Sequence, residues 1–312
     1  MNDNNPYATI DNAHPDLAVL SGGIAVVTGG ASGIGYALAE KAISFGLHPA
    51  IADINETAVK EAEARLAPAA SAAGVELLAC AVDVSSEESV RAFADTVFER
   101  FPGKPISLLC CNAGVGGGAA SVITAKDADW DFVLGVNLKG AVYCVRMFVP
   151  YMLSQNAPGS VMATSSQDGL CAAQGIYGVS KHACIAFTEA LHNELQGRLT
   201  VHVLCPNVVA TNIIKSDLNR PARFGGPPEL SEGRKVAQDS ISNRFKELGM
   251  PPSRCADMVF DAIQTGVFYV LAEAEEDPGY VHLEVETRMN SILNGDRPYR
   301  PQSKFIAKIF NR

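Results

Sequence analysis

Tyr177 and Lys181 stand four residues apart in the run IYGVSKHACIAFTEALHNEL, residues 176–195. Residues with this spacing share one face of a helix, and the same face continues through small and apolar residues to Leu195, as a buried stripe would. A phenol ordinarily has a pKa of about 10, and a neighbouring ammonium lowers it, so such a pair could exchange a proton with a substrate oxygen. Taken alone, however, the pair is more typical of a solvated helix end whose lysine extends into water.

A glycine-rich turn occupies TGGASGIGYALAE, residues 28–40, directly after an apolar run. Gly29, Gly33 and Gly35 would allow a tight turn and let backbone N–H groups approach a pyrophosphate at the positive end of a helix. Asp53 ends the next apolar run, about 20 residues further on, where a dinucleotide-binding fold places a carboxylate on the adenosine ribose hydroxyls. A turn or a helix cap would explain either feature alone, but the two together favour a dinucleotide site.

The surroundings of Asp53 also indicate which dinucleotide binds. A carboxylate that accepts hydrogen bonds from the ribose repels a 2′-phosphate, and the stretch IADIN contains no arginine or lysine that could bind one. The sequence therefore favours NAD as the cofactor over NADP.

Polar or small residues follow two later apolar runs. Asp83 could accept a hydrogen bond from the adenine amino group. Asn112, Ala113 and Gly114 could form a small-residue floor beneath the cofactor. Both groups could equally be turn residues, since Asn, Asp and Gly are the residue types that turns prefer.

Three more polar groups occupy positions where chemistry could occur. Asn137 carries an amide inside an apolar helical stretch, which is unfavourable unless a partner satisfies it. The run at 159–165 leads into Ser166, and the run at 199–206 is followed by a stretch that presents Thr211 at the sheet edge. All these residues can act together only if the fold brings the ends of the runs to one place.

Short apolar runs alternate with helical patterns over about the first 270 residues, which predicts a parallel sheet covered by helices on both faces. We expect a single-domain α/β fold, a Rossmann-like doubly wound sheet of about seven strands, whose ligands bind beyond the carboxyl ends of the strands. The expected strands are 24–29, 48–53, 75–82, 106–112, 159–165, 199–206 and 267–272.

Two segments depart from this alternation. Residues 211–253 are rich in glycine, proline and charge, and we expect them to form a lid within the dehydrogenase-like domain at 21–272. We also expect residues 273–312 to form a C-terminal helical extension and residues 1–20 to form an N-terminal extension that packs loosely.

Composition excludes several classes of partner. The chain has 312 residues, 47% of them hydrophobic, and a net charge of −9 without a basic cluster, which argues against nucleic acid or an anionic membrane as partner. No apolar run approaches the roughly 20 residues of a membrane span, and the start has no secretory signal. The eight cysteines show no C-x-x-C spacing, so we expect reduced thiols, no metal site and a cytoplasmic protein.

The ordered set of motifs resembles the short-chain dehydrogenase/reductase family. The family pattern of T-G-x-x-x-G-x-G, N-A-G, a helix asparagine, a serine and Y-x-x-x-K is matched at 28–35, 112–114, Asn137, Ser166 and Tyr177 with Lys181. Each motif is weak alone, but the ordered set is specific and extends over roughly residues 20–272. It favours a buried Tyr177–Lys181 pair that lines a cofactor cleft over a solvated helix end.

The resemblance implies a role for each residue. Tyr177 would be the general acid or base, Lys181 would also hold the nicotinamide ribose, Ser166 would bind the substrate oxygen, and Asn137 would hold a water that links the lysine to solvent. A homodimer or homotetramer built on the helices of Asn137 and Tyr177 is also implied. The implied cofactor contacts are Gly29, Ser32, Gly33, Ile34, Gly35, Asp53, Asp83, Val84, Asn112, Ala113, Gly114, Tyr177, Lys181, Val209 and Thr211.

Two departures from the family pattern affect single residues. The loop from Ser166 to Tyr177 is shorter than usual, which leaves Ser165 as a second candidate for the serine. The family's Pro-Gly after the sixth strand is Pro206-Asn207 here, which would restrict that turn but leave Thr211 available.

The expected function is hydride transfer between a nicotinamide cofactor and a secondary alcohol or ketone. The length and apolar content of the expected lid indicate a fairly large apolar or aromatic substrate. The stretch NRPARF and the helical tail are similar to those of bacterial dehydrogenases that oxidise benzylic alcohols of lignin-derived aryl ethers, although steroid-like or polyketide alcohols would fit as well. The alternative is a catalytically idle sensor or scaffold that binds the nucleotide without turnover.

Overall fold

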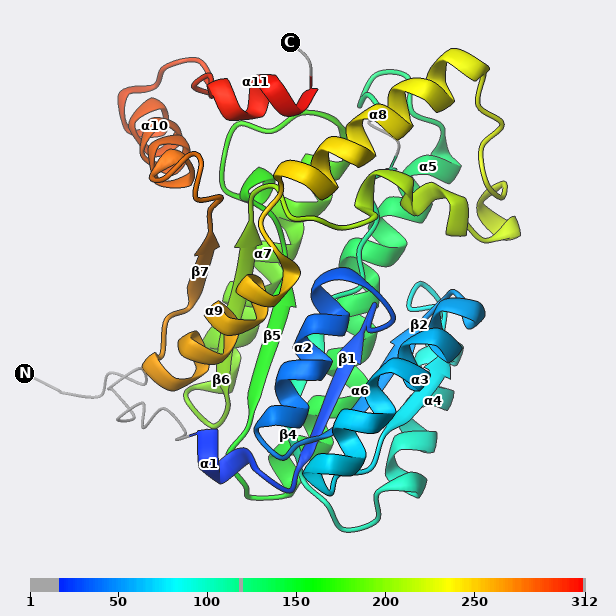
Figure 1. The fold of residues 1–312 in the computed structure, drawn as a ribbon. Coiled ribbons are helices and arrows are strands. Elements are labelled where there is room, and N and C mark those ends of the chain that lie inside the picture. Colours follow the sequence, from blue (N-terminus) through cyan, green and yellow to red (C-terminus); the bar gives the residue numbers. More distant parts are fainter. Residues whose placement is uncertain (1–16, 118–119, 311–312) are drawn as a thin grey trace, which may run out of the picture.

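The computed structural model describes residues 17–117 and 120–310 (Figure 1). Seven parallel strands form one sheet in the order β3-β2-β1-β4-β5-β6-β7, which confirms the predicted doubly wound α/β fold. The strands are β1 Ile24–Thr28, β2 His48–Asp53, β3 Leu78–Ala81, β4 Ile106–Cys111, β5 Ser160–Thr164, β6 Thr200–Pro206 and β7 Tyr269–Ala272.

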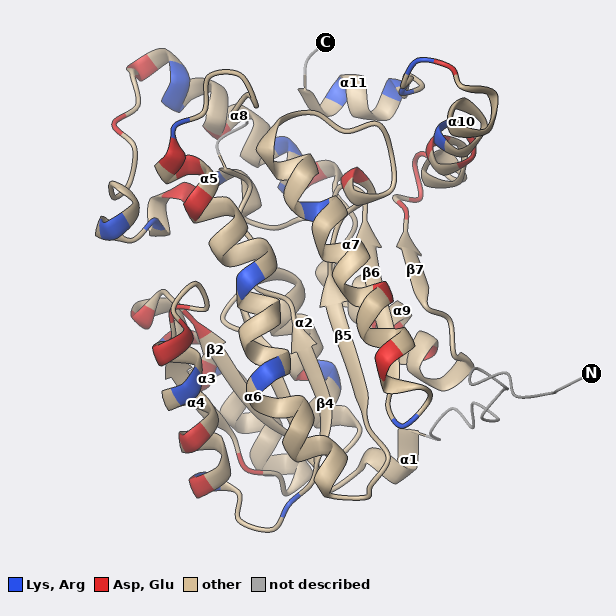
Figure 2. Ribbon diagram, turned by 180° about the vertical axis from the view of Figure 1, so that it is seen from behind, with Lys and Arg blue, Asp and Glu red and all other residues tan. Residues whose placement is uncertain are grey.

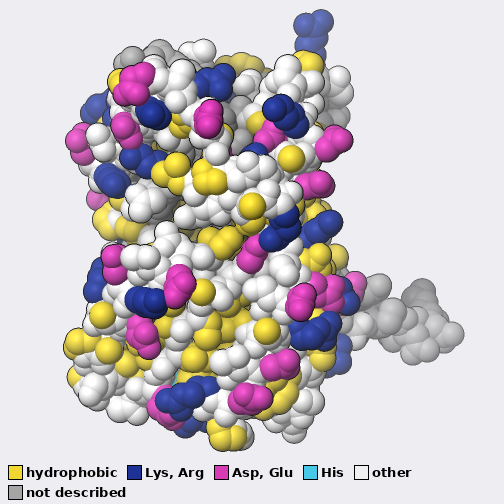
Figure 3. All heavy atoms as spheres, turned by 90° about the vertical axis from the view of Figure 1, so that its right-hand side faces the viewer, with side chains coloured by type: hydrophobic (Ala, Val, Ile, Leu, Met, Phe, Trp, Pro, Cys, Tyr) yellow, Lys and Arg dark blue, Asp and Glu magenta, His cyan; other side chains and the backbone are white. Residues whose placement is uncertain are grey.

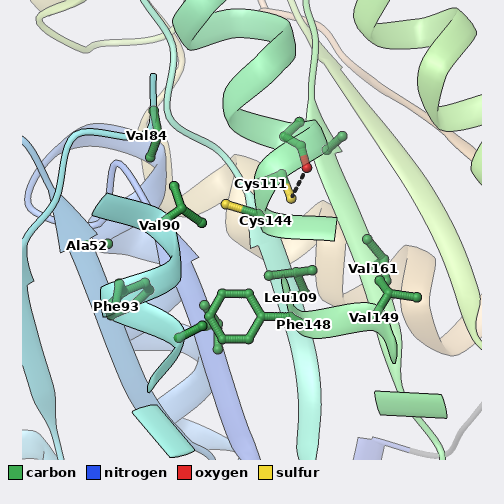
Figure 4. Packing of buried hydrophobic residues seen from close by; sticks show 14 of the residues in the cluster. Ala52, Val84, Val90, Phe93, Leu109, Cys111, Cys144, Phe148, Val149 and Val161 are labelled. Carbon is green, nitrogen blue, oxygen red and sulfur yellow. Dashed lines mark hydrogen bonds between the residues drawn. The ribbon is translucent and has the colours of Figure 1, made fainter. Parts of the chain in front are cut away.

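Helices cover both faces of the sheet, because successive strand side chains point to opposite faces and both sets are apolar. In β1, Val26 belongs to the core beneath α4, α6 and α7, whereas Val27 belongs to the core beneath α2, α3 and α9. Figure 4 shows the first core around Phe148, which lies between the sheet and α4. The covering helices are α2 Gly33–Ser44, α3 Glu56–Ala73, α4 Glu87–Arg100, α6 Gly140–Ser154, α7 Gly175–Leu195 and α9 Pro252–Thr265.

One helical run differs from its sequence-based description. Residues 127–154 form α5 (Asp127–Leu134), a π-helix η2 (Gly135–Lys139) and α6, a continuous run of 28 residues that is long and apolar enough to cross a membrane. The expectation that no segment reaches that length is therefore wrong. Half of its most apolar window is buried in the protein, and the run packs against α4, α7 and β4, as a core helix does.

The strands point toward the end of the molecule that carries α8, α10 and α11 (Figure 1). The expected lid contains two 3-10 helices, η4 (Ile213–Asn219) and η5 (Ala222–Phe224), and the helix α8 (Glu232–Leu248). The C-terminal extension contains α10 (Tyr280–Asn294) and α11 (Lys304–Phe310). A small apolar core joins α8 to α11, with Phe245 and Ile309 at its centre and Ile213 and Ile214 packed against it.

Charges of both signs are spread over the helices (Figure 2). On the face drawn in Figure 3, Lys and Arg side chains alternate with Asp and Glu rather than gathering into one basic surface.

Candidate active site

The glycine-rich turn connects β1 to α2 at the carboxyl end of the sheet. Gly29 has φ +63°, and a Cβ on it would lie 2.9 Å from the Ala113 Cα. A Cβ on Gly35 would lie 2.1 Å from the Gly29 carbonyl oxygen, so a side chain at either position would displace backbone. Ser32, the exposed N-cap residue of α2, makes no side-chain capping bond, which leaves the first-turn N–H groups open to an anion.

Thr28 and Asn112 tie the first and fourth strands together below this turn. The Thr28 hydroxyl accepts hydrogen bonds from the backbone N–H of Asn112 at 3.0 Å and of Ala113 at 3.1 Å. The Asn112 amide donates to the Thr28 carbonyl oxygen at 3.0 Å and accepts from the Thr164 hydroxyl on β5 at 3.0 Å. Asn112 and Ala113 therefore hold the floor in a fixed shape, and Thr164 is a site residue that the sequence analysis missed because an ordinary strand threonine gives no motif.

Two carboxylates lie at the ends of β2 and β3. Asp53 accepts hydrogen bonds from the backbone N–H of Asn55 at 3.1 Å and of Ala31 at 3.4 Å, and burial raises the pKa of its carboxyl. Asp83 accepts from the Ser85 hydroxyl through Oδ1 and pairs with Arg223 through Oδ2 at 2.7 Å. Nothing in the spacing of the sequence indicated Arg223, because its contact with Asp83 depends on how the segment after β6 crosses the sheet.

The Tyr177–Lys181 pair lies in the first turns of α7, where the fold buries Lys181 and leaves Tyr177 partly exposed. Lys181 is only 2% exposed, its ammonium donates to the Thr164 carbonyl oxygen at 3.0 Å, and burial lowers its pKa. Its Nζ lies 5.6 Å from the centroid of the Tyr177 ring. Lys181 is therefore part of the interior at the sheet edge and does not extend into water, as it would at a solvated helix end, while Tyr177 stays partly accessible.

The pKa of Tyr177 moves in the opposite direction from that expected. Burial raises it, the negative charge of Asp168 raises it further, and hydrogen bonding with the Ser166 hydroxyl lowers it. Lys181 is not among the groups that lower the pKa of Tyr177, and its ammonium donates to the Thr164 carbonyl oxygen. In the protein without its cofactor, the Tyr177 phenol is therefore held in its protonated form. The prediction that Lys181 lowers the pKa of Tyr177 in this state is wrong.

Ser165 and Ser166 point to different partners. The Ser165 hydroxyl donates to the backbone carbonyl oxygen of Lys181 at 2.8 Å and so joins β5 to α7. The Ser166 hydroxyl accepts from the Asp168 backbone N–H at 3.2 Å and lies beside the Tyr177 phenol. The hydroxyl next to the phenol thus belongs to Ser166.

Asn137 lies in the π-helix η2, where the local change of helical pitch turns it inward. Its side chain accepts from the Val115 N–H at 2.8 Å and donates to the Val115 carbonyl oxygen at 3.0 Å and to the Ser180 hydroxyl at 2.9 Å. A Cβ on Gly114 would lie 3.3 Å from the Lys181 Nζ and 3.5 Å from the Asn137 Oδ1. The fold therefore brings these three expected residues together around one small space.

The remaining expected contacts are less exposed to the cleft. Val84 and Val209 are 6% and 4% exposed and pack in the two cores, so only their backbone could meet a ligand. Ile34 is half-buried against the core beneath α2. Thr211 touches the turn, since a Cβ on Gly33 would lie 2.9 Å from its Cγ2.

All eight cysteines are free thiols, and seven of them are buried. Within residues 17–117 and 120–310, no cluster of three or more His, Cys, Asp or Glu side chains could hold a metal ion.

Comparisons with known proteins agree with this geometry. The family model described as short chain dehydrogenase matches residues 23–221. The "CLA biosynthesis dehydrogenase/reductase" of Lactiplantibacillus plantarum is 30% identical over 284 residues, 87% of this chain and 93% of the relative. The "C alpha-dehydrogenase" of Sphingobium sp. is 28% identical over 280 residues, 88% of this chain and 87% of the relative.

Solved structures are similar over nearly the whole length. A short chain dehydrogenase/reductase from Burkholderia phymatum in complex with NAD has a TM-score of 0.80 and 32% identity, and the match covers 91% of this chain and 99% of that one. A metagenomic short-chain oxidoreductase in complex with NADP has a TM-score of 0.61 and 25% identity, and the match covers 82% of this chain and 98% of that one. Similar structures thus bind either nicotinamide cofactor.

Proposed function

We propose that the cofactor of this protein is NAD and that its substrate is a fairly large apolar or aromatic secondary alcohol or the matching ketone. The chain belongs to the short-chain dehydrogenase family and acts as an alcohol dehydrogenase or ketone reductase. The observation that carries the proposal is the cluster of Ser166, Tyr177 and buried Lys181 beside the glycine turn, at the carboxyl ends of the strands. The same observation favours an enzyme over an idle nucleotide sensor, which has no need of a proton-transfer pair.

The turn residues fit a dinucleotide on their own geometry. Gly29 and Gly35 allow the turn to pack closely against backbone, where a Cβ would not fit, and the uncapped start of α2 offers N–H groups to a pyrophosphate. Asp53, without a basic neighbour in IADIN, would accept the adenosine ribose hydroxyls and disfavour a 2′-phosphate, which supports NAD over NADP. The cofactor supplies the acceptance and return of a hydride when it is bound.

This chain's own residues handle the proton and the substrate oxygen. Tyr177 would remove the hydroxyl proton during alcohol oxidation and return it during ketone reduction, and Ser166 would hold the same oxygen by a hydrogen bond. Because burial raises the pKa of Tyr177, the phenolate needs an added positive charge in the cleft before it forms near neutral pH. Lys181, fixed on the Thr164 carbonyl oxygen, would hold a ribose, and Asn137 would hold a water that connects it to solvent.

The substrate proposal depends on the segment that follows Thr211. It brings Phe224 against Phe132 with ring centroids 5.8 Å apart, and Ile213 and Ile214 into the small core shared with α11. Apolar groups along this segment suit a substrate with a large apolar or aromatic part. The similarity to a C alpha-dehydrogenase supports a benzylic alcohol as the first compound to test.

The experiment is a screen of the purified protein with NAD and a series of secondary alcohols, from short aliphatic through benzylic to steroidal. We expect NAD reduction with the larger members and none with Tyr177→Phe, which is the matched control. Binding of NAD without reduction by any alcohol, in either direction of the reaction, would favour the nucleotide-binding sensor. The free thiols are consistent with a cytoplasmic protein, which we include in the proposal.

A further inference from the structure

The loop that carries Ser166 is bound by a residue from the far C-terminal end of the described chain. Ser166 leads directly into the 3-10 helix η3 (Gln167–Gly169), in which Asp168 donates its backbone N–H to the Ser166 hydroxyl. The Asp168 carboxylate pairs with the guanidinium of Arg300 at 2.8 Å. Arg300 lies in the extension between α10 and α11, outside the residues 23–221 that match the family model.

Arg300 is itself held in place by α10. Its Nε pairs with Glu284, a carboxylate only 1% exposed, and the Tyr280 hydroxyl one helical turn earlier donates to the same carboxylate at 2.7 Å. A second arginine, Arg288 of α10, donates to the Leu170 carbonyl oxygen at 3.0 Å, just after η3. A buried glutamate is costly without a partner, so Arg300 is fixed by one carboxylate while it reaches the other.

This arrangement controls charge next to the phenol. Asp168 is one of the groups that raise the pKa of Tyr177, and the Arg300 guanidinium pairs with its Oδ1 at 2.8 Å. The other groups that face Asp168 are the Cys171 thiol, with Sγ 3.8 Å from Oδ1, and Glu284 through Arg300. The groups that face Tyr177 are Ser166, Asp168, Lys181 and Cys184.

We propose that Arg300 is a positioning residue for proton transfer at Tyr177. It balances the charge of Asp168 and holds the η3 turn so that the Ser166 hydroxyl stays on the phenol, and the C-terminal extension thereby completes the active site. The inference rests on the proposed alcohol dehydrogenase function, because it assigns Arg300 to the proton step of that reaction. It predicts that removing the positive charge of Arg300, in the C-terminal extension, alters the pH dependence of catalysis.

The test removes the arginine without leaving Glu284 buried and unpaired. In Arg300→Met/Glu284→Gln, Asp168 loses its counter-charge, so the pH at which kcat/KM reaches half its maximum for alcohol oxidation should rise by about one unit. Adding Asp168→Asn removes the unbalanced carboxylate and should return the midpoint to the wild-type value or below it. A purely structural role would not produce this reversal, since the third substitution restores no contact with the extension.

Three controls separate the possible outcomes. Arg297→Met changes an exposed arginine of the same segment and should leave the pH profile unchanged. Arg300→Lys keeps a positive charge and should give an intermediate profile. Thermal unfolding of each variant shows whether the extension remains folded, and a midpoint that does not move in the folded double variant would overturn the inference.

A spectroscopic readout keeps the inference distinct from the proposed function. The difference in near-ultraviolet phenolate absorbance between each protein and its Tyr177→Phe counterpart, recorded with NAD bound, reports the titration of this one phenol. The Arg300→Met/Glu284→Gln background should shift that titration to higher pH whether or not a substrate has been found. An unshifted titration alongside normal turnover would refute the role of Arg300 and leave the dehydrogenase function intact.

Discussion

Arg223, in the segment after β6, forms an ion pair of 2.7 Å with Asp83 at the end of β3. The pair joins the expected lid to the carboxylate that the sequence analysis assigns to the adenine amino group. Both oxygens of Asp83 are engaged, since Oδ1 accepts from Ser85 and Oδ2 meets Arg223. The adenine amino group could therefore bind Asp83 only if it shared the carboxylate with Arg223 or displaced Arg223 from it.

This competition gives the first prediction. Arg223→Ala should strengthen NAD binding by up to about fivefold, because a partly exposed ion pair contributes roughly 1 kcal/mol at most. Asp83→Ala should weaken binding, and Arg234→Ala, an exposed arginine on α8, serves as the control. Isothermal titration with NAD measures all three. Weaker binding by Arg223→Ala would mean that the arginine contacts the cofactor instead of competing with it.

The second prediction concerns the proton. Tyr177→Phe should reduce kcat by about 10²–10⁴-fold, because it removes general acid–base catalysis but keeps the ring. NAD binding should remain nearly intact. Lys181→Ala should impair both turnover and NAD binding, since it removes the proposed ribose contact and leaves the Thr164 carbonyl oxygen without its donor. Activity of Tyr177→Phe above a few per cent of wild type would contradict the assignment.

The third prediction concerns cofactor choice. Wild-type protein should prefer NAD, and Asp53→Ala combined with Ile54→Arg should narrow or invert the preference, because it replaces a repelling carboxylate by a group that binds a 2′-phosphate. Ile54 is 38% exposed at the end of β2, so the arginine can be accommodated, and Ile54→Arg alone is the matched control. Equal use of NAD and NADP by the wild type would show that Asp53 does not face the ribose.

Asp53 also predicts a pH dependence of NAD binding. Burial raises the pKa of its carboxyl, so it takes up a proton at a higher pH than an exposed aspartate does. The protonated form is a poorer acceptor for two ribose hydroxyls, and NAD affinity should fall as the pH is lowered toward that raised pKa. Fluorescence titration at several pH values measures the effect, which Asp53→Asn should abolish.

The sequence predicted best what local chemistry determines. The order of strands and helices, the glycine turn and the Tyr177–Lys181 face follow from apolar periodicity and from residue types at fixed spacing. Arg223 and Arg300 could not be found in this way, because their partners Asp83 and Asp168 are far away in sequence and only the path of the chain joins them. The pKa of Tyr177 was misjudged for a related reason, since burial outweighs charge in a way that spacing does not reveal.

Another prediction concerns assembly. We expect a homodimer or homotetramer built on the helices that hold Asn137 and Tyr177, and Val179, 45% exposed on α7, lies on that surface. Val179→Glu should shift sedimentation toward smaller species. Val19→Glu, at a valine 57% exposed on the short helix α1 (Leu17–Leu20), is the control and should have no effect. A wild-type monomer at micromolar concentration would refute the proposed assembly.

The last prediction concerns the lid at 211–253, whose two halves are held differently. In the first half, Ser216 accepts a hydrogen bond from the Gly116 N–H at 2.8 Å, and Arg220 pairs with Asp129 at 2.8 Å. In the second half, residues 231–237 at the start of α8 are all exposed. The first half is therefore held by residues next to the expected cofactor cleft. In the second half, the exposed start of α8 has few contacts that oppose local opening, whereas its later part is held by Phe245 in the core shared with α11.

We expect amide hydrogen exchange in the lid to be fast in the free protein and to slow in two steps. NAD should slow the first half, which follows Thr211 and includes Ile213 and Ile214, and substrate should then slow the region from Phe224 onward. At a cofactor concentration about 100 times Kd, exchange that requires release of NAD should slow by up to about 100-fold. Amides of β4 serve as the internal control, because that strand is buried in the sheet with or without ligand. Exchange that is already slow without ligand would identify the segment as a fixed part of the fold, and the argument that a gate admits a large apolar substrate would then lose its basis.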